Sequence, residues 1–362
     1  MLEFIKCPTY KEASEKTEQL LSRLEYIPSN LKEPKVFIKP NIGATSLKVN
    51  TSPEVVRGII HYLKSLSIDD IVIGEGAVET EYESTPYNFH HQGWDKLAEK
   101  EHVKLLDLNK CEREPYTWEY GCIELPAILH THSYINVAKM KTHQQTLVSL
   151  CTKNQKGLLD SATRKQFHRL GLHEPIAELA KVVQPELCLV DAVEAVEGNG
   201  PGDFGTMKHV GLIVAGDNML DVDTYCCEIM GIDPLRVQHL ELTGKLVMQP
   251  PLVSPFKLPD KEFKIFNVHM NPRNACTACQ SSIGKLSKLA KRSTSGQLFF
   301  TKYGIFSRLD IIMGSNATVP ENHGKIIFYG DCVKALAEKY PEYNFFSGCP
   351  PVSKDVLEEL TK

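Results

Sequence analysis

Short apolar runs alternate with segments whose apolar residues recur at three- and four-residue spacing along most of the chain. The runs are typical of buried strands and the spaced segments of amphipathic helices. Residues 36–38 and 71–73 are two such runs, and a helix with Ser52 as its N-cap and Pro53 in its first turn separates them. This order predicts a strand-helix-strand unit, and therefore a parallel sheet.

The same alternation returns at residues 134–137, 188–191 and 210–216. A proline-rich stretch over residues 244–262 is the clearest predicted linker. We therefore expect an α/β fold in two parts. A core built of βαβ units covers residues 1–262, and a smaller C-terminal α/β domain that carries a cysteine-ligated cluster covers residues 263–362.

One segment does not follow either pattern. Residues 80–93 are polar and aromatic, with several Tyr, Pro and Asn residues. We expect no regular structure there, and a polar loop of this length can act as a lid over a site.

Four cysteines of the C-terminal part stand where a predicted strand gives way to a predicted helix: Cys276, Cys279, Cys332 and Cys349. Two cysteines separated by two residues, as in the first pair, can ligate one metal centre. In a parallel sheet such strand ends gather along one edge, where helix N-termini favour an anionic group. The pattern predicts that the four thiolates hold a 4Fe-4S cluster.

Other interpretations of the cysteines remain open. A structural zinc also takes four cysteines, although its sites commonly pair two C-x2-C knuckles and only one is present. Some of the 11 cysteines are expected to be ordinary buried thiols. Cys332 has the least distinctive surroundings, and with three ligands the cluster would keep an open iron.

Basic and amide side chains follow the predicted strands of the core. They are Lys39, Asn41, Lys141, His143, Lys153 and Asn154, and Asn199 joins them from a glycine-rich loop. We expect Lys141 and His143 in the loop after the strand at residues 134–137. Such lysines can bind a carboxylate or a phosphate, and His143 can transfer a proton beside Lys141 and Lys153 as catalytic groups. A solvated basic loop explains the composition equally well.

Composition narrows the function classes. With 362 residues, a net charge of −4 and 42% hydrophobic residues, the chain is typical of a globular protein without nucleic acid or an anionic membrane as its main partner. The net charge does not exclude a local basic patch. No apolar run approaches the length of a transmembrane helix, and the N-terminus lacks a secretory signal. An odd number of dispersed cysteines indicates a reducing cytoplasm, and an oxygen-sensitive cluster would suit an anaerobic host.

Several short motifs occur together in one order: Lys39-Pro40-Asn41, residues 135–143, Lys153-Asn154, residues 197–201 and Asp221-Val222-Asp223. This series resembles the family known as domain of unknown function 362 over most of residues 35–235. Members of that family often carry iron-sulfur cysteines, which the resemblance therefore implies here. Their usual pair of ferredoxin-type cysteine runs is missing. Residues 348–351 are similar to the cluster-ligating end of the small electron-transfer subunit of respiratory complex I.

These features together predict a 4Fe-4S oxidoreductase that acts on a small anionic substrate in a cleft between the domains. No flavin or nicotinamide motif is visible, so electrons would come from an external donor such as a ferredoxin. One alternative is a non-redox enzyme with an open iron, of the hydro-lyase or sulfur-removing type. Another is an electron-transfer or maturation protein without its own substrate.

Overall fold

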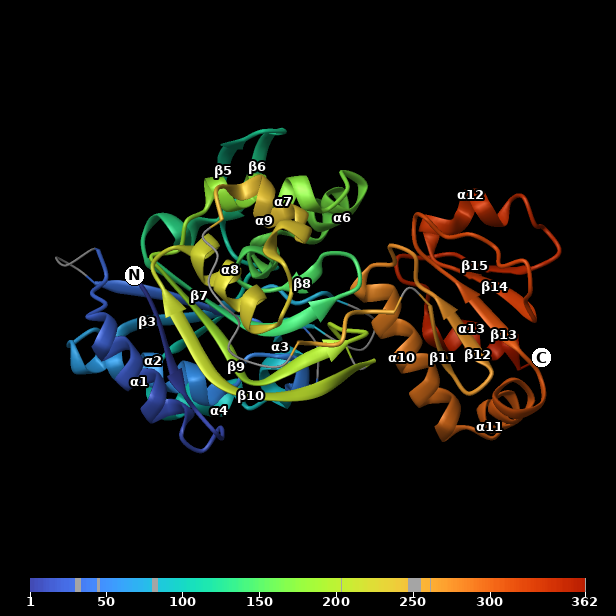
Figure 1. Ribbon diagram of the computed structural model, residues 1–362, viewed down its shortest axis with the longest axis horizontal. Helices are drawn as coiled ribbons and strands as arrows, with labels where there is room; N and C mark the ends of the chain where they lie inside the picture. The colour runs from blue at the N-terminus through green and yellow to red at the C-terminus, as the bar shows by residue number, and fades with distance from the viewer. Residues whose placement is uncertain are drawn as a thin grey trace. The chain divides into compact units, whose positions relative to one another are not determined.

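The computed structural model of the chain describes residues 1–29, 34–43, 46–79, 84–202, 204–246, 255–260 and 262–361. It divides into two compact units. The first comprises Met1–Glu197 and Thr206–Lys257, and the second comprises Gly198–Gly205 and Leu258–Lys362. Each unit combines helices with a mainly parallel sheet (Figure 1), so the predicted α/β fold is confirmed.

The first unit is organised around an eight-stranded sheet. Its strands are β1 (Leu2–Lys6), β2 (Lys35–Pro40), β3 (Asp70–Glu75), β4 (Lys104–Asp107), β7 (Ser133–His143), β8 (Leu147–Ser149), β9 (Leu187–Gly198) and β10 (Gly205–Gly216). The order across the sheet is β1-β10-β9-β7-β2-β3-β4, with β8 beside β7. Since β3, β2, β7 and β9 run parallel, their carboxyl ends share one edge of the sheet.

Helices of the first unit cover both faces of this sheet. They are α1 (Ala13–Leu24), α2 (Pro53–Ser65), α3 (Thr85–His91), α4 (Trp94–Glu101), α5 (Cys151–Asn154), α6 (Ser161–Arg169), α7 (His173–Val182), α8 (Met219–Ile229) and α9 (Gln238–Thr243). Successive strand residues point to opposite faces. Accordingly, Ile38 packs with α1, α2 and α4, whereas Phe37 packs with α7.

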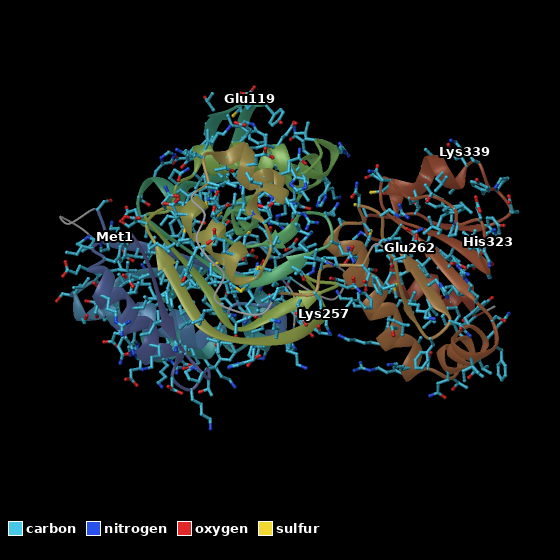
Figure 2. The ribbon with its side chains drawn as sticks, in the orientation of Figure 1. Met1, Glu119, Lys257, Glu262, His323 and Lys339 are labelled. Atoms are coloured by element: carbon cyan, nitrogen blue, oxygen red, sulfur yellow. The ribbon has the colours of Figure 1, made fainter. Side chains whose placement is uncertain are left out.

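A hairpin of β5 (Arg113–Trp118) and β6 (Gly121–Pro126) packs into the same core as Phe37 and α7. Glu119 marks the turn of this hairpin (Figure 2). The sequence pattern had not indicated this hairpin. No helix in the described ranges is both long and apolar enough to cross a bilayer.

The second unit contains a five-stranded sheet of β11 (Phe263–Ile265), β12 (Val268–Asn271), β13 (Leu309–Ile312), β14 (Lys325–Tyr329) and β15 (Asn344–Phe346), in that order. β12 to β15 are parallel and β11 is antiparallel. Residues of α10 (Thr277–Arg292), α11 (Thr294–Thr301) and α13 (Ser353–Leu360) pack into the core on one face. The short α12 (Lys334–Ala337) covers the other face.

Two expectations about local structure are wrong. Residues 85–91 form α3, because the Ser84 hydroxyl accepts a hydrogen bond from the Tyr87 amide and Pro86 occupies the first turn. Residues 80–83 lie outside the described part. β7 does not end at residue 137 but runs to His143, so Lys141 and His143 lie within a buried strand rather than in a loop.

Close packing between α1 and α2 can be tested by substitution of a glycine at their contact. A Cβ at Gly58 of α2 would lie 2.3 Å from the carbonyl oxygen of Ser14. We expect Gly58→Ala to lower the free energy of unfolding by about 1–3 kcal/mol, because the helices must move apart. Thermal and urea unfolding followed by circular dichroism would measure this.

Gly284 of α10 provides the matched control, since a Cβ there would meet no atom within 4 Å. Gly284→Ala should stabilise its own unit by about 0.5–1 kcal/mol through helix propensity. Equal effects of the two substitutions would contradict the packing explanation.

Candidate functional site

A buried ion pair occupies the carboxyl edge of the first sheet. Lys39 near the end of β2 donates from Nζ to Oε2 of Glu75, the last residue of β3, over 2.9 Å, and both side chains are almost fully buried. The backbone amides of Ile42 and Gly76 donate to the same carboxylate over 3.1 and 2.9 Å. Burial lowers the pKa of Lys39, and Glu75 opposes this effect. The carboxylate therefore has its charge and its lone pairs satisfied.

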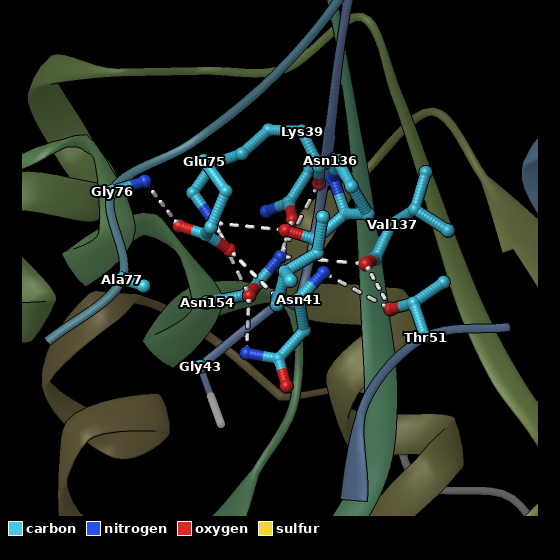
Figure 3. A network of polar contacts seen from close by, with 12 residues as sticks. Lys39, Asn41, Gly43, Thr51, Glu75, Gly76, Ala77, Asn136, Val137 and Asn154 are labelled. Carbon is cyan, nitrogen blue, oxygen red and sulfur yellow. Dashed lines mark hydrogen bonds and ion pairs between the residues drawn. The ribbon is translucent and has the colours of Figure 1, made fainter. Parts of the chain in front are cut away.

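Asn154, at the end of α5, is the centre of the surrounding polar network (Figure 3). Its Oδ1 accepts from Lys39 Nζ over 3.3 Å and from Asn41 Nδ2 over 3.0 Å. Its Nδ2 donates to Oδ1 of Asn136 on β7 over 2.8 Å, and Asn136 in turn donates to the Cys151 carbonyl oxygen over 2.9 Å. The network therefore fixes α5 against the ends of β2 and β7.

The start of α5 is fixed as well. Both side-chain oxygens of Asp223, from α8, accept the backbone amides of Cys151 and Thr152 over 2.8 and 2.7 Å. A carboxylate at a helix N-terminus satisfies amides that have no partner within the helix. Burial nevertheless raises the pKa of Asp223 to about 6.

Lys141 has a different environment from Lys39. Its Nζ donates to Asn41 Oδ1 over 2.6 Å and to the Val49 carbonyl oxygen over 2.7 Å, and neither acceptor carries a negative charge. Burial, followed by the charges of Lys153 and Lys139, lowers the pKa of Lys141 well below its usual value. Lys141 is therefore a buried amine whose two hydrogen-bond acceptors are uncharged and which lacks a carboxylate partner among the described residues.

Lys139, two residues earlier in β7, belongs to a separate pair. Its Nζ lies 3.1 Å from Oδ2 of Asp191 and also contacts the Tyr10 hydroxyl. The backbone amide of Ser52 donates to the same carboxylate over 2.9 Å. An irregularity in the β7–β9 register separates Lys139 from Lys141 and places them in these different surroundings.

His143, the last residue of β7, is buried, and its protonation follows from its neighbours. Its Nδ1 accepts the backbone amides of Gln145 and Thr146 over 3.0 and 3.3 Å, so the ring proton resides on Nε2. Burial, followed by the charges of Lys153, Lys156 and Lys141, lowers the pKa of His143 well below 6.5. The ring is therefore neutral at pH 7 and can donate only through Nε2.

Lys153 of α5 is half-buried, and burial lowers its pKa to about 8. In the described part of the chain its ammonium group has no carboxylate within ion-pairing distance. Lys141 and Lys153 thus form, with His143, a group of donors at the sheet edge that favours an anion.

Two further histidines border this group. His173 of α7 carries its proton on Nε2, because that atom lies 3.2 Å from the Gln145 carbonyl oxygen. Its Nδ1 then accepts from His239 Nδ1 over 3.4 Å, which leaves His239 Nε2 as an acceptor. That buried nitrogen has no hydrogen-bond partner among the described residues. Sequence reasoning missed this pair, since only the packing of α7 against α9 brings it together.

The predicted substrate residue Asn199 has another location. It belongs to the second unit, where its Nδ2 donates to Asp260 Oδ2 over 3.1 Å and its Oδ1 accepts the Asp260 amide over 2.8 Å. Both the nitrogen and the oxygen of its side-chain amide are therefore hydrogen-bonded to Asp260.

The four predicted cluster ligands all belong to the second unit, at the carboxyl edge of its parallel strands. Cys276 is the N-cap of α10 and Cys279 lies in the first turn. Cys332 lies in a 3₁₀ turn after β14, and Cys349 lies between β15 and α13. Cys279 is buried, Cys276 is half-buried and the other two are exposed.

Hydrogen bonds hold the loops that carry these cysteines together. Asp331 Oδ1 accepts the Gly348 amide over 2.7 Å, and the Asp331 amide donates to the Gly348 carbonyl oxygen over 3.1 Å. Ser282 of α10 donates to the Pro351 carbonyl oxygen over 3.0 Å. A Cβ at Gly330 would lie 3.2 Å from the Cys279 sulfur, and the φ of Gly330 is +97°. Glycine is therefore required at this close approach.

The thiols also interact with one another. A hydrogen bond with the Cys276 thiol, burial and the charges of Cys276, Cys349 and Cys332 raise the pKa of Cys279 well above its usual value. Burial, then Cys276 and Cys349, raise the pKa of Cys332. Among the described residues no three His, Cys, Asp or Glu side chains are already arranged to hold a metal ion.

The geometry of the first unit can now be compared with known proteins. The family described as Domain of unknown function (DUF362) matches residues 36–228, from β2 into α8. The chain belongs to this family. The predicted resemblance is thereby confirmed. The DUF362 region contains Lys39, Lys141 and Lys153, whereas the four cysteines lie beyond its end.

The chain is also similar to a thylakoid-associated protein from Synechocystis sp.. The two are 28% identical over 151 residues, which cover 38% of this chain and 46% of the relative. The similarity thus extends over about half the length of that relative.

Substitution of Lys39 and Glu75, singly and together, tests the energetic coupling of this buried ion pair. We expect Lys39→Met to lower the free energy of unfolding by about 3–5 kcal/mol, because Glu75 would remain as a buried, unpaired charge. The double variant Lys39→Met/Glu75→Leu should cost less than the sum of the single variants, as urea unfolding would show.

Lys104 and Asp70 form the matched exposed pair on the same sheet, with an Nζ–Oδ1 distance of 3.0 Å. Lys104→Met should change the free energy of unfolding by less than about 1 kcal/mol. Additive effects at Lys39 and Glu75 would mean that the pair is not coupled.

Proposed function

We propose that the protein is a 4Fe-4S oxidoreductase whose cluster is held by Cys276, Cys279, Cys332 and Cys349. The observation that carries the proposal is the convergence of three separate strand ends, with all four cysteines, on one edge of the second sheet. Four thiolates are a complete ligand set for such a cluster. A structural zinc would take the same four thiolates, although its sites commonly pair two C-x2-C knuckles and only one is present here.

The surroundings of the thiols suit this ligand set. The amides at the start of α10 and the positive end of the helix face the edge where Cys276 and Cys279 lie, and both favour an anionic group. The location of Cys332 directly after β14, at the same sheet edge as the other three thiols, supports a fourth ligand rather than an open iron. When bound, the cluster would supply one-electron transfer. An external donor such as a ferredoxin, in a cytoplasmic and reducing setting, is part of the proposal.

The substrate of the proposed enzyme is a small anion that binds at the edge of the first sheet. Lys141 and Lys153 have no carboxylate of their own among the described residues, and they would bind a carboxylate or phosphate group, whose negative charge would favour their ammonium forms. His143 would donate a hydrogen bond from Nε2. Lys39, Asn41 and Asn154 would hold these groups in place, because their polar atoms already bond to one another.

Metal analysis tests the cluster. Protein purified without oxygen should contain about four iron and four sulfide per chain, and dithionite should produce an electron paramagnetic resonance signal. Ala substitution at each of the four cysteines should reduce the iron content or change the signal, because each removes one ligand. Iron and sulfide assays and the spectra are the measurements.

Cys122, an exposed thiol on β6, provides the control, and Cys122→Ala should leave the iron content unchanged. Zinc without iron would refute the cluster. Two results together would instead support the open-iron alternative: Cys332→Ala keeps a full cluster, and small anions shift the spectrum of the unsubstituted protein.

The pKa of Lys153 generates a separate prediction for the anion site. The ammonium form exists below about pH 8, so the affinity for inorganic phosphate or succinate should fall as the pH rises through that value. Lys153→Met should weaken binding at pH 7 by about tenfold or more. Isothermal titration calorimetry at several pH values would measure both effects.

Lys153→Arg should retain binding at pH 9, because the guanidinium group stays charged. Lys165→Met, at an exposed position of α6, is the control and should bind both anions normally. Binding that is independent of pH and of residue 153 would exclude Lys153 from the site.

A further inference from the structure

The charge of the chain is distributed unevenly, and the second unit contains the extreme case. The net charge is −4 overall, yet residues 263–309 contain no Asp or Glu and eight basic residues: Lys264, Arg273, Lys285, Lys288, Lys291, Arg292, Lys302 and Arg308. Two of the eight, Arg273 and Arg308, form ion pairs with the flanking Glu262 and Asp310. Four of the eight lie in the second half of α10. Lys288, Lys291 and Arg292 are exposed and follow helical spacing, so they share one face of that helix.

Large apolar side chains are exposed immediately after this basic helix. Leu298 of α11 is 68% exposed, and Ile305 and Phe306 of its π-helical continuation (Lys302–Phe306) are 65% and 78% exposed. Their spacing of seven and eight residues places them on one side of the helix. Phe299 and Tyr303, on the other side, are buried in the core of the unit.

A fourth exposed residue extends this surface. Phe266, in the turn between β11 and β12, is 69% exposed, and the next residue, Asn267, donates from Nδ2 to the Ile305 carbonyl oxygen over 3.0 Å. We call Phe266, Leu298, Ile305 and Phe306 the apolar ridge. Lys302 lies within it, four residues after Leu298, with its Nζ 5.2 Å from the centre of the Tyr303 ring.

α10 and α11 are held together closely at the junction between the basic and apolar surfaces. A Cβ at Gly296 would lie 2.1 Å from the Ala290 carbonyl oxygen, so α11 turns back directly against the end of α10. The basic face of α10 and the apolar ridge are therefore held in fixed positions relative to each other. A core-packed helix that also exposes several large apolar side chains among polar ones indicates an interaction surface.

We propose that this surface binds the interfacial region of an anionic lipid bilayer, with the apolar ridge among the headgroups and acyl-chain ends and the basic face of α10 against the lipid charges. The ridge consists of single side chains that are each 65–78% exposed. A bilayer accepts such projecting groups, whereas a protein partner needs a matching hollow for each. The absence of acidic residues over this sequence suits a diffuse negative surface. The proposal does not depend on the cluster or on the anion site.

Vesicle flotation with the full-length chain tests the proposal. Vesicles of phosphatidylcholine with added phosphatidylglycerol should carry the protein to the top of the gradient, and vesicles of phosphatidylcholine alone should bind it at least about tenfold more weakly. High salt should release it, because the attraction between charges is screened. Leu298→Ser/Phe306→Ser should reduce the partition coefficient by about tenfold or more.

Matched variants separate this surface from general stickiness. Leu235→Ser in the first unit removes another exposed apolar residue (57%) and should bind like the unsubstituted chain. Lys288→Gln/Lys291→Gln should weaken binding to anionic vesicles, whereas Lys339→Gln, beyond α12 (Figure 2), should not. Circular dichroism of each variant shows that it is folded.

Three results would overturn the proposal. The first is absence of binding to anionic vesicles, and the second is binding that persists in folded Leu298→Ser/Phe306→Ser. The third is self-association in sedimentation velocity that this variant abolishes, which would make the apolar ridge a contact between two copies of the chain.

Discussion

The buried pair of Lys39 and Glu75 is the constraint on which the edge of the first sheet depends. A lysine ammonium placed at the end of a central strand requires a carboxylate, and that carboxylate requires further donors once it leaves water. The amides of residues 42 and 76 supply them. Asn154 then connects the pair to α5, so the positions of two loops and one helix follow from the desolvation of a single charge pair.

Ion pairing distinguishes the lysines of the first unit from one another, which composition alone does not. Lys39 and Lys139 each have a carboxylate within 3.1 Å, whereas Lys141 and Lys153 have none among the described residues. His143 beside them is neutral, because burial and then the nearby lysine charges lower its pKa. Lys141, Lys153 and His143 therefore form a group that a small anion would complete.

The second unit uses backbone geometry rather than charge pairs to assemble its candidate site. Parallel strands bring their carboxyl ends to one edge, and Asp331 ties the loops of Cys332 and Cys349 together. Gly330 permits the approach of the Cys279 sulfur. The same unit exposes the apolar ridge, which lies mainly on α11 and its continuation. The four cysteines and the apolar ridge therefore lie in different elements.

The sequence by itself determined the α/β class, the family, and the placement of each cysteine between a strand and a helix, because these depend on local periodicity and on short motifs. It did not determine that β7 continues to His143, since charged residues in a strand become acceptable only when distant partners such as Asp191 and Asn41 satisfy them. It also did not reveal the contact between His173 and His239 or separate paired from unpaired lysines. Only the tertiary structure decides which polar groups lose water together.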